Sequence, residues 1–296
     1  MTIGYIGLGK MGTNMCLRLL SKDYKVVVYN RTYQKAKGLS KKGAIPAKTL
    51  QELTSNIKEP RLIWLMVTNT VVNQLIVQLI PNLSKGDTII DGGNSFYKDS
   101  IKNNKLFKKH KINFLDVGVS GGPSGALNGA SLMVGGEKSV YKKHESLFKD
   151  LSVENGYSYL GNPGSGHFVK MVHNAIEYGF MQSLAEGFDL LKNSEFNLNL
   201  NDVLKSYNHG SVIESKLTKD LSKAYLKYGF NLIEVGGKAQ SSGEALWAVK
   251  DAETKKIKFN VIKESLKARI YSQKNPNYQA KIIQALRNTF GGHSLK

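Results

Sequence analysis

Five polar side chains of different chemistry recur at helical spacing in the segment 164–178. In chain order they are Lys170, His173, Asn174, Glu177 and Tyr178. These positions are i, i+3, i+4, i+7 and i+8, so a helix would place all five on one face. An amine and a carboxyl group on one helix face can act as proton acceptor and proton donor. A solvated polar stripe on an amphipathic helix is the alternative. The mixture of chemical types and the glycines before the stripe favour a site.

A glycine-rich segment stands between a predicted strand at 2–6 and a predicted helix at 13–21. Gly7-Leu8-Gly9-Lys10-Met11-Gly12 matches the pattern G-x-G-x-x-G. Gly7 would permit the tight turn, Gly9 would let backbone approach a pyrophosphate, and Gly12 would let the helix pack on the strand. An ordinary glycine-rich turn is the alternative. A second strand predicted at 25–29 completes a βαβ unit and favours dinucleotide binding.

Residues 30–32 occupy the position where an NAD site places Asp or Glu to hold the ribose 2′-hydroxyl. Here they are Asn30, Arg31 and Thr32. An acid would repel a 2′-phosphate, whereas a guanidinium with amide and hydroxyl donors would bind it. We therefore expect NADP rather than NAD, with a surface arginine as the alternative. Val67, which ends a predicted strand at 62–67, is assigned to the cofactor as well.

Two further glycine-bearing segments, 91–95 and 119–123, follow predicted strands. The first contains Asn94, and the second contains Ser120, Gly121 and Gly122. Sheets of this class bind ligands at the carboxyl ends of their strands, and adjacent glycines let backbone amides point at an anion. Each segment could equally be only a turn, so both interpretations stay open.

The order of the predicted elements indicates two domains. Strands predicted at 62–67, 88–90 and 113–117 alternate with helices at 71–79 and 100–110, which is typical of a parallel, doubly wound sheet. After residue 163 helices are predicted at 167–192, 201–207, 215–228, 238–251, 259–273 and 278–288. We expect an α/β protein with a Rossmann-type, doubly wound dinucleotide-binding domain over residues 1–163. An all-helical substrate and oligomerisation domain would follow over residues 164–296.

The chain has 296 residues, with 42 Lys and Arg against 23 Asp and Glu, and a formal net charge of +19. The charge is spread over both halves, and only five of the basic residues are Arg, the side chain that nucleic-acid recognition favours. We expect a Lys-rich solvated surface and no nucleic-acid partner. Cys16 is the single cysteine, and the chain shows neither a signal-peptide pattern nor an apolar run of ~20 residues that would span a bilayer. We expect a cytoplasmic protein with no membrane partner.

The sequence resembles the short form of the 6-phosphogluconate dehydrogenases nearly end to end. Glycine motifs at 7–12, 91–95, 119–122 and 132–136 and Tyr-Asn-Arg-Thr at 29–32 fit that family, and the broader β-hydroxyacid dehydrogenase superfamily shares the glycine motifs. His-Phe-Val-Lys-Met-Val-His-Asn-Ala-Ile-Glu-Tyr at 167–178 is peculiar to the phosphogluconate branch. The resemblance implies oxidative decarboxylation of 6-phospho-D-gluconate to D-ribulose 5-phosphate and CO2 with NADP and without a metal. That reaction belongs to the oxidative pentose phosphate pathway and to gluconate utilisation.

The same resemblance implies residue roles. Lys170 would be the general base that takes the C3 hydroxyl proton, and Glu177 the acid that protonates C1 of the enediol. Such a base needs a pKa low enough to be neutral when substrate binds. Tyr178 and Arg269 would hold the phosphate. The implied substrate contacts are Asn94, Ser120, Gly121, Gly122, His173, Asn174, Tyr178, Arg269, Arg287 and His293. The implied cofactor contacts are Gly7, Leu8, Gly9, Lys10, Met11, Gly12, Asn30, Arg31, Thr32, Val67 and Asn94.

Two departures from the longer family members bear on substrate and assembly. Leu246 stands where longer members have a lysine that binds the phosphate, so Lys238 or Lys250 is a candidate replacement. The chain also has room for about one copy of a helical domain that longer members carry in duplicate. The tail from Arg287 to His293 resembles the pair that reaches into a neighbouring subunit's active site, which implies a homodimer or higher oligomer.

Two other hypotheses stay open. One is a 3-hydroxyisobutyrate-type dehydrogenase of a small unphosphorylated acid, for which Arg269, Tyr178 and Arg287 would have no phosphate to hold. The other is a cofactor-binding regulatory or nucleic-acid-associated protein without catalysis. The pairing of Lys170 with Glu177 argues against that second hypothesis. NAD is the weaker cofactor alternative.

Overall fold

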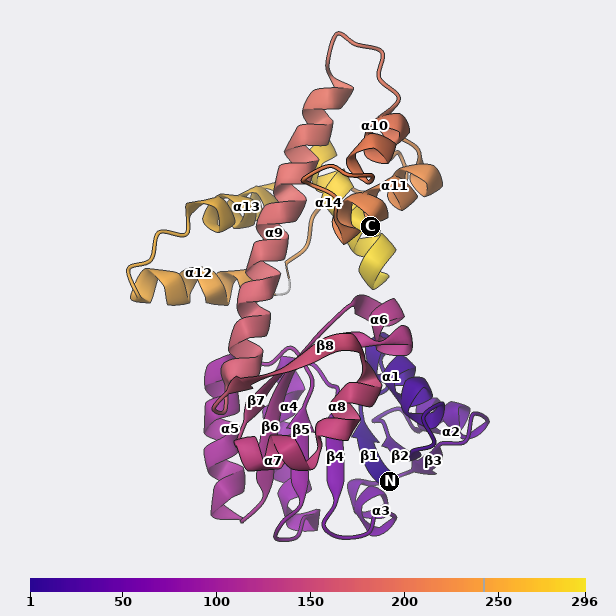
Figure 1. Ribbon diagram of the computed structural model, residues 1–296, viewed down its shortest axis with the longest axis vertical. Coiled ribbons are helices and arrows are strands. Elements are labelled where there is room, and N and C mark those ends of the chain that lie inside the picture. Colours follow the sequence, from indigo (N-terminus) through magenta and orange to yellow (C-terminus); the bar gives the residue numbers. More distant parts are fainter. Residues whose placement is uncertain (242) are drawn as a thin grey trace. The chain divides into compact units, whose positions relative to one another are not determined.

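The computed structural model describes residues 1–241 and 243–296. The chain divides into two compact units, Met1–Lys170 and Met171–Lys296 (Figure 1). The first unit is built on one β-sheet, and the second consists of helices and their connections. None of the helices in the described ranges combines the length and the apolarity that a bilayer crossing requires. The predicted fold class, a Rossmann-type α/β domain followed by a helical one, is confirmed.

The sheet of the first unit has eight strands in the order β3-β2-β1-β4-β5-β6-β7-β8. The strands are β1 (Thr2–Ile6), β2 (Lys25–Tyr29), β3 (Ile45–Ala47), β4 (Leu62–Leu65), β5 (Thr88–Asp91), β6 (Asn113–Ser120), β7 (Ala130–Gly136) and β8 (Ser152–Gly161). The run from β3 to β6 is parallel throughout and has the strand order of a doubly wound dinucleotide fold. All these strands therefore end at one edge of the sheet.

The sheet is not parallel throughout, which corrects the sequence prediction. β7 runs antiparallel to β6, and β8 pairs in parallel with β7. Neither strand was predicted. β8 carries Glu154, Asn155 and Gly156 in its middle and is largely exposed or half-buried, so it lacks the apolar run that identifies a buried strand.

Helices cover both faces of this sheet. They are α1 (Lys10–Leu20), α2 (Tyr33–Ser40), α3 (Leu50–Ser55), α4 (Asn69–Leu79), the 3-10 turn η1 (Ile80–Asn82), α5 (Tyr97–Lys109), α6 (Gly122–Asn128), α7 (Lys138–Lys143) and α8 (Glu145–Leu151). Successive side chains of β2 show the two-sided burial: Val26 and Val28 enter one apolar cluster, and Val27 enters the other. A strand with apolar residues on both faces needs helices on both sides.

Among the described residues, the second unit holds the six helices that helical periodicity predicts, the first of which begins in the first unit. They are α9 (Ser165–Lys192), α10 (Leu200–Tyr207), α11 (Lys216–Tyr228), α12 (Glu244–Thr254), α13 (Asn260–Ser272) and α14 (Tyr278–Gly291). Within this unit, Figure 1 shows α10 and α11 on one side of α9 and α12 and α13 on the other. The helix predicted at 238–251 is shorter, since α12 begins after Gly243, whose φ is +100°; residue 242 lies outside the described residues.

Candidate active site

The glycine loop after β1 has the shape of a phosphate cradle. A Cβ on Gly7 would lie 2.4 Å from the Met66 carbonyl oxygen, and one on Gly12 would lie 2.0 Å from the Gly7 carbonyl oxygen, so neither position accepts a side chain. A Cβ on Gly9, in contrast, would meet nothing within 4 Å. Gly9 is the N-cap of α1 and makes no side-chain cap bond. The backbone at the helix start is therefore open to a ligand and fits a dinucleotide pyrophosphate.

Asn30 braces this loop from the end of β2. Its Oδ1 accepts from the Leu8 backbone N–H at 2.9 Å, and its Nδ2 donates to the Thr32 carbonyl at 3.1 Å. Both ends of the amide thus hold the loop in shape. Arg31 and Thr32 are exposed beside it, and the Thr32 hydroxyl does not cap α2 although Thr32 is its N-cap. Arg31 thus presents an exposed charge at this corner.

Val67 and the turn that carries Asn94 continue the same edge of the sheet. The Val67 carbonyl oxygen would lie 2.5 Å from a Cβ on Gly93, and the Val67 side chain would lie 2.9 Å from one on Gly7. Asp91, fully buried, holds the turn: its Oδ1 accepts from the Gly93 N–H at 3.1 Å, and its Oδ2 accepts from the Ser95 hydroxyl at 2.7 Å. Asn94 is exposed at the tip.

Ser120 ends β6 at that same edge, and two glycines with positive φ follow it. Gly121 has φ +121° and caps α6, and Gly122 has φ +62°. The predicted ligand-binding segments of this unit are therefore gathered at the carboxyl ends of neighbouring parallel strands, as the fold requires. Lys170, only 8% exposed, belongs to this unit as well, since its Cβ lies 2.4 Å from where a Cβ on Gly118 would stand.

Sequence reasoning missed two carboxylates here. Asp91 braces the Asn94 turn as described above, and Asp116 accepts from the backbone N–H groups of Gly164 and His167 at 2.7 and 2.8 Å. Both are 0% exposed. Asp91 could have been suspected from its place before two glycines, whereas the partners of Asp116 lie about fifty residues away in sequence, so no local signal identified it.

In the helical unit, the polar stripe of α9 is half-buried and internally connected. His173 Nδ1 lies 3.0 Å from Asn174 Oδ1 and 3.9 Å from Glu177 Oε2. The helical spacing that the sequence predicted is therefore real, and it brings an imidazole beside a carboxylate. At 3.9 Å the His173 and Glu177 atoms lie in electrostatic contact but beyond hydrogen-bond distance.

A second cluster forms around Arg269 on α13, which is 1% exposed. Its guanidinium carbon lies 3.3 Å from the centre of the Tyr178 ring, a cation–π contact. The Tyr178 hydroxyl donates to the Ser241 hydroxyl at 3.0 Å. Arg287 on α14, 8% exposed, donates to the Gln240 carbonyl at 2.7 Å, and Arg269 reaches the same oxygen at 3.4 Å.

The electrostatics of this cluster favour an anion. Burial lowers the pKa of Arg269 to about 10, with the Tyr178 side chain raising it and the charge of Arg287 lowering it. Burial also lowers the pKa of Arg287. Across the described residues no carboxylate lies within 4 Å of either guanidinium, and Arg269 Nε is buried without a hydrogen-bond partner. The charge of Glu177 raises both pKa values, and that of Glu244 raises the pKa of Arg287, so these carboxylates compensate the pair in part. An anion in direct contact would offset more of the cost of burying the two cations.

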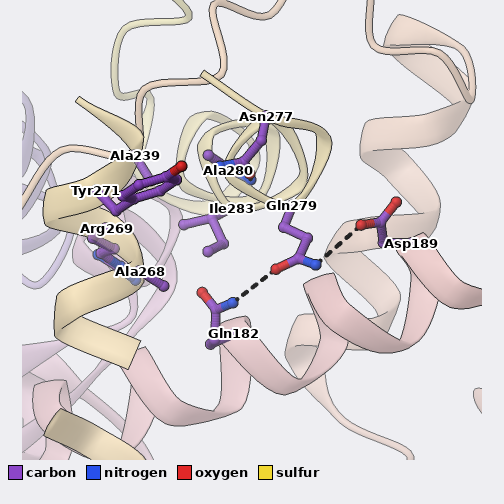
Figure 2. Close-up of a pocket in the computed structure, with 10 residues that line it drawn as sticks. All are labelled: Gln182, Asp189, Ala239, Ala268, Arg269, Tyr271, Asn277, Gln279, Ala280 and Ile283. Atoms are coloured by element: carbon purple, nitrogen blue, oxygen red, sulfur yellow. Dashed lines mark hydrogen bonds between the residues drawn. The ribbon is translucent and has the colours of Figure 1, made fainter. Parts of the chain in front are cut away.

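A cavity of about 230 Å³ borders Arg269 within the helical unit (Figure 2). Gln182 Nε2 donates to Gln279 Oε1 at 3.1 Å, and Gln279 Nε2 donates to Asp189 Oδ2 at 3.0 Å. These lining groups satisfy one another. Arg269, in contrast, lines the cavity with a buried Nε that has no hydrogen-bond partner.

The carboxyl-terminal tail folds back on its own helix. The His293 carbonyl accepts from Asn288 Nδ2 at 2.6 Å, while the His293 side chain is exposed. Arg287, at the other end of this segment, is bound to Gln240 of its own chain. Nowhere in the described ranges do three His, Cys, Asp or Glu side chains gather so as to hold a metal ion.

Family profiles match both units. The profile of the NAD binding domain of 6-phosphogluconate dehydrogenase matches residues 2–161, and that of the 6-phosphogluconate dehydrogenase C-terminal domain matches residues 166–278. The chain belongs to the 6-phosphogluconate dehydrogenase family. As a member of that family it is an oxidoreductase of the β-hydroxyacid dehydrogenase type with an NAD(P)-binding domain, so the resemblance seen in its sequence is confirmed.

Curated relatives of this 6-phosphogluconate dehydrogenase family member fall into two lengths. YqeC of Bacillus subtilis, named as a candidate 6-phosphogluconate dehydrogenase, is 42% identical over 100% of this chain and 99% of its own length. An NAD(+)-dependent, decarboxylating 6-phosphogluconate dehydrogenase of Haloferax volcanii is 33% identical over 100% and 98%. A decarboxylating enzyme of Buchnera aphidicola is 36% identical, but the chain spans 61% of its length.

Solved structures show the same fold. A Plasmodium falciparum 6-phosphogluconate dehydrogenase, determined in apo form and with NADP+ and 6-phosphogluconate, has a TM-score of 0.83 at 30% identity, covering 97% of this chain and 70% of the other. A 3-hydroxyisobutyrate dehydrogenase of Mycobacterium tuberculosis has a TM-score of 0.73 at 18% identity, covering 97% and 99%. The latter likeness concerns the fold alone.

Proposed function

We propose that the protein catalyses the oxidative decarboxylation of 6-phospho-D-gluconate to D-ribulose 5-phosphate and CO2 with NADP as electron acceptor. The observation that carries this proposal is the pair of buried guanidiniums, Arg269 and Arg287, that no carboxylate within 4 Å neutralises among the described residues. A phosphate group supplies the missing negative charge and accepts several charge-assisted hydrogen bonds. A small unphosphorylated acid has no phosphate group to offer this arginine pair.

The cofactor would be held along the carboxyl edge of the sheet. The open backbone at Gly9 would receive the pyrophosphate, and Arg31 would bind the adenosine 2′-phosphate while Asn30 keeps the loop in shape. When bound, the nicotinamide accepts the hydride that leaves C3 of the substrate. Relatives differ on the dinucleotide, since one is named as NAD(+)-dependent and another was solved with NADP+; the exposed Arg31 favours NADP.

Lys170 and Glu177 would then handle the protons. Lys170 takes the proton of the C3 hydroxyl, which leaves a 3-keto acid. Protonated Lys170 polarises that carbonyl, the C1 carboxylate leaves as CO2, and the electron pair is held as an enediol. Glu177 gives its proton to C1 of the enediol, which is the former C2 of gluconate, and the enediol O–H proton returns to Lys170, which yields the ketose. Lys170 is buried, with 8% of its surface exposed, and its packing against Gly118 at β6 supports this role.

The other polar groups would orient the substrate. Ser120 and the amides after it would bind the carboxylate together with His173, and Asn94 and Asn174 would bind hydroxyls. Tyr178 and the two buried arginines would hold the phosphate, and Lys250, one helical turn after Leu246 on α12, is the nearer candidate for the missing lysine contact. The net charge of +19 would attract both phosphorylated ligands.

We also propose a homo-oligomer formed through the helical unit, in the cytoplasm. Several large apolar side chains of that unit are well exposed, among them Val212, Ile233, Leu190 and Leu226 at 103, 80, 75 and 72%. Exposed apolar surface of this kind marks association sites. Within this oligomer the residues that follow α14, His293 included, would reach a neighbouring active site, while Arg287 stays with Arg269 of its own chain. Light scattering after size exclusion measures the mass, and a monomer of 32.7 kDa would contradict it.

The test of the reaction is an absorbance assay of NADPH formation with 6-phosphogluconate, run beside gluconate and 3-hydroxyisobutyrate and repeated with NAD. We expect 6-phosphogluconate with NADP to give the highest kcat/KM. Faster turnover of 3-hydroxyisobutyrate would instead support the small-acid dehydrogenase.

A further inference from the structure

One face of β6 forms the seat of helix α9. Asp116, Gly118 and Ser120 alternate along the strand and therefore share a face. Asp116 Oδ1 accepts from the Gly164 N–H at 2.7 Å, and Asp116 Oδ2 accepts from the His167 N–H at 2.8 Å. Both carboxylate oxygens thus bind backbone amides at the start of α9, where a negative charge also complements the helix dipole.

Three glycines bring α9 closer to the sheet than side chains would allow. A Cβ on Gly118 would lie 2.4 Å from the Lys170 Cβ. One on Gly135 of β7 would lie 2.5 Å from the Gly166 N, and one on Gly166 would lie 2.4 Å from the carbonyl oxygens of Asp116 and Met133. Real Cβ atoms do not stand this close, so any added methyl group would push the first turns of α9 off the strands.

A side-chain contact to α5 adds to this seat. His167 Nδ1 lies 2.7 Å from the Ser100 hydroxyl, and both residues are buried. The first turn of α9 is therefore fixed from β6, β7 and α5. Lys170 follows His167 by one turn of the same helix.

We propose that Asp116 is a positioning residue: it fixes the start of α9 on β6 and thereby sets where Lys170 stands relative to Ser120, at the end of the same strand. The inference rests on the proposed function, because it takes Lys170 as the base and Ser120 as a substrate contact. Proton transfer demands this placement, since a misplacement of ~1 Å can cost ~10²-fold in rate. Asp116 itself touches no substrate.

The test compares Asp116→Asn and Asp116→Ala with a matched control, Asp87→Asn. Asp87 is also 0% exposed and also accepts from two backbone amides, those of Arg61 at 2.6 Å and Ser84 at 2.9 Å. It differs from Asp116 in also pairing with the Arg61 guanidinium at 3.0 Å. It precedes β5 at the opposite edge of the sheet. Each variant is assayed as purified full-length protein, with rates expressed per folded molecule.

We expect kcat to fall by ~10-fold in Asp116→Asn, which keeps one acceptor oxygen, and by ~10²-fold in Asp116→Ala. KM for NADP should stay within ~3-fold in both, because the glycine loop on β1 and α1 is untouched. Asp87→Asn should lower the melting temperature while kcat stays within ~3-fold of the wild type. A purely structural role for Asp116 would instead make the Asp116 and Asp87 variants behave alike.

Gly135→Ala tests the same seat with Asp116 intact, should the Asp116 variants fail to fold. The added methyl group meets the Gly166 N and Asp116 Oδ1, so we expect a fall in kcat of at least ~10-fold with KM for NADP again unchanged. Wild-type kcat in Gly135→Ala, or in a folded Asp116→Ala, would overturn the proposal.

Amide hydrogen exchange measured by NMR separates this inference from the proposed function. The Gly164 and His167 amides should be protected in the wild type and in Asp87→Asn, and should exchange freely in Asp116→Ala. If the wild type oxidised none of the hydroxy acids, the proposed function would fail while the exchange data still judged the anchoring. Normal activity of a wild type whose Gly164 and His167 amides are unprotected would contradict the positioning role of Asp116 and leave the proposed function intact.

Discussion

Replacement of Arg287 by Met probes the cation pair that distinguishes a phosphorylated substrate. Arg287 donates to the Gln240 carbonyl at 2.7 Å, and Arg269 Nη1 still reaches that oxygen at 3.4 Å, so the carbonyl keeps a donor after the substitution. A hydrogen bond to a charged group contributes ~1.5–3 kcal/mol. A tenfold change in affinity corresponds to ~1.4 kcal/mol. Loss of the contact between Arg287 and the substrate phosphate should therefore raise KM for 6-phosphogluconate by about 10- to 150-fold, with a smaller effect on kcat.

The same substitution should leave the free protein's stability nearly unchanged or raise it. Breaking a buried ion pair costs ~3–5 kcal/mol because it strands a charge, but Arg287 has no carboxylate within 4 Å among the described residues, and its charge lowers the pKa of Arg269. Its removal relieves repulsion between two buried cations but also removes the attraction of Arg287 to Glu177 and Glu244, so the two effects oppose each other. Thermal unfolding with and without inorganic phosphate should show stabilisation by phosphate in the wild type and little in Arg287→Met.

Steady-state kinetics with 6-phosphogluconate and gluconate provide the assay, and Arg287→Lys is the matched control. Lysine keeps the charge but lacks the planar fork, so its KM should lie between those of the wild type and Arg287→Met. KM for gluconate, which has no phosphate, should not change. An equal rise in KM for both substrates, or a rise below ~3-fold for 6-phosphogluconate, would refute the reasoning.

Three further predictions follow from the site and the core. Lys170→Met and Glu177→Gln should each lower kcat by ~10²-fold or more, since positioned acid–base groups contribute that much. Glu195→Gln, a substitution at an exposed position after α9, is the control. A near-normal kcat in either active-site variant would remove the role proposed for that residue. Arg31→Asp should shift the ratio of kcat/KM from NADP toward NAD, because an acid repels the 2′-phosphate; an unchanged ratio counts against that contact. Burial, with a smaller effect of Lys143, lowers the pKa of His144 to about 4. Because the unfolded chain takes up that proton near pH 6.5, the free energy of unfolding should fall as pH drops from about 6.5 to 4. Urea titrations at several pH values should show a weaker pH dependence of the free energy of unfolding in His144→Gln than in the wild type. An equal pH dependence contradicts the assignment.

The strands and helices that the sequence predicted are those with strong local patterns. Three consecutive valines in β2 identify a strand buried on both faces, and the periodicity of α9 extends over its whole length. β7 and β8 were not predicted because glycines and polar residues interrupt their apolar pattern. The pairing of β7 with β6 and of β8 with β7 also depends on contacts that are distant in sequence. Short helices such as α3, which Thr49 caps through the Glu52 N–H, give too few turns for periodicity to detect.

The candidate site also has parts that the sequence predicts and parts that only the structure shows. The glycine loop and the α9 stripe are visible as motifs because spacing alone defines them. The buried state of Arg269 and Arg287 is not, since they lie on different helices and their shared carbonyl, that of Gln240, is on a connection; only the family resemblance pointed to them. Asp116 had no local signal, and the bracing role of Asn30 appeared only with the fold.

The most direct test of the reaction is its stoichiometry with purified protein, 6-phosphogluconate and NADP. NADPH is followed by absorbance, CO2 is trapped and counted from substrate labelled at C1, and the sugar phosphate is identified by mass spectrometry. We expect one CO2 and one ribulose 5-phosphate for each NADPH formed. NADPH without CO2, with a phosphorylated keto acid as the product, would contradict it.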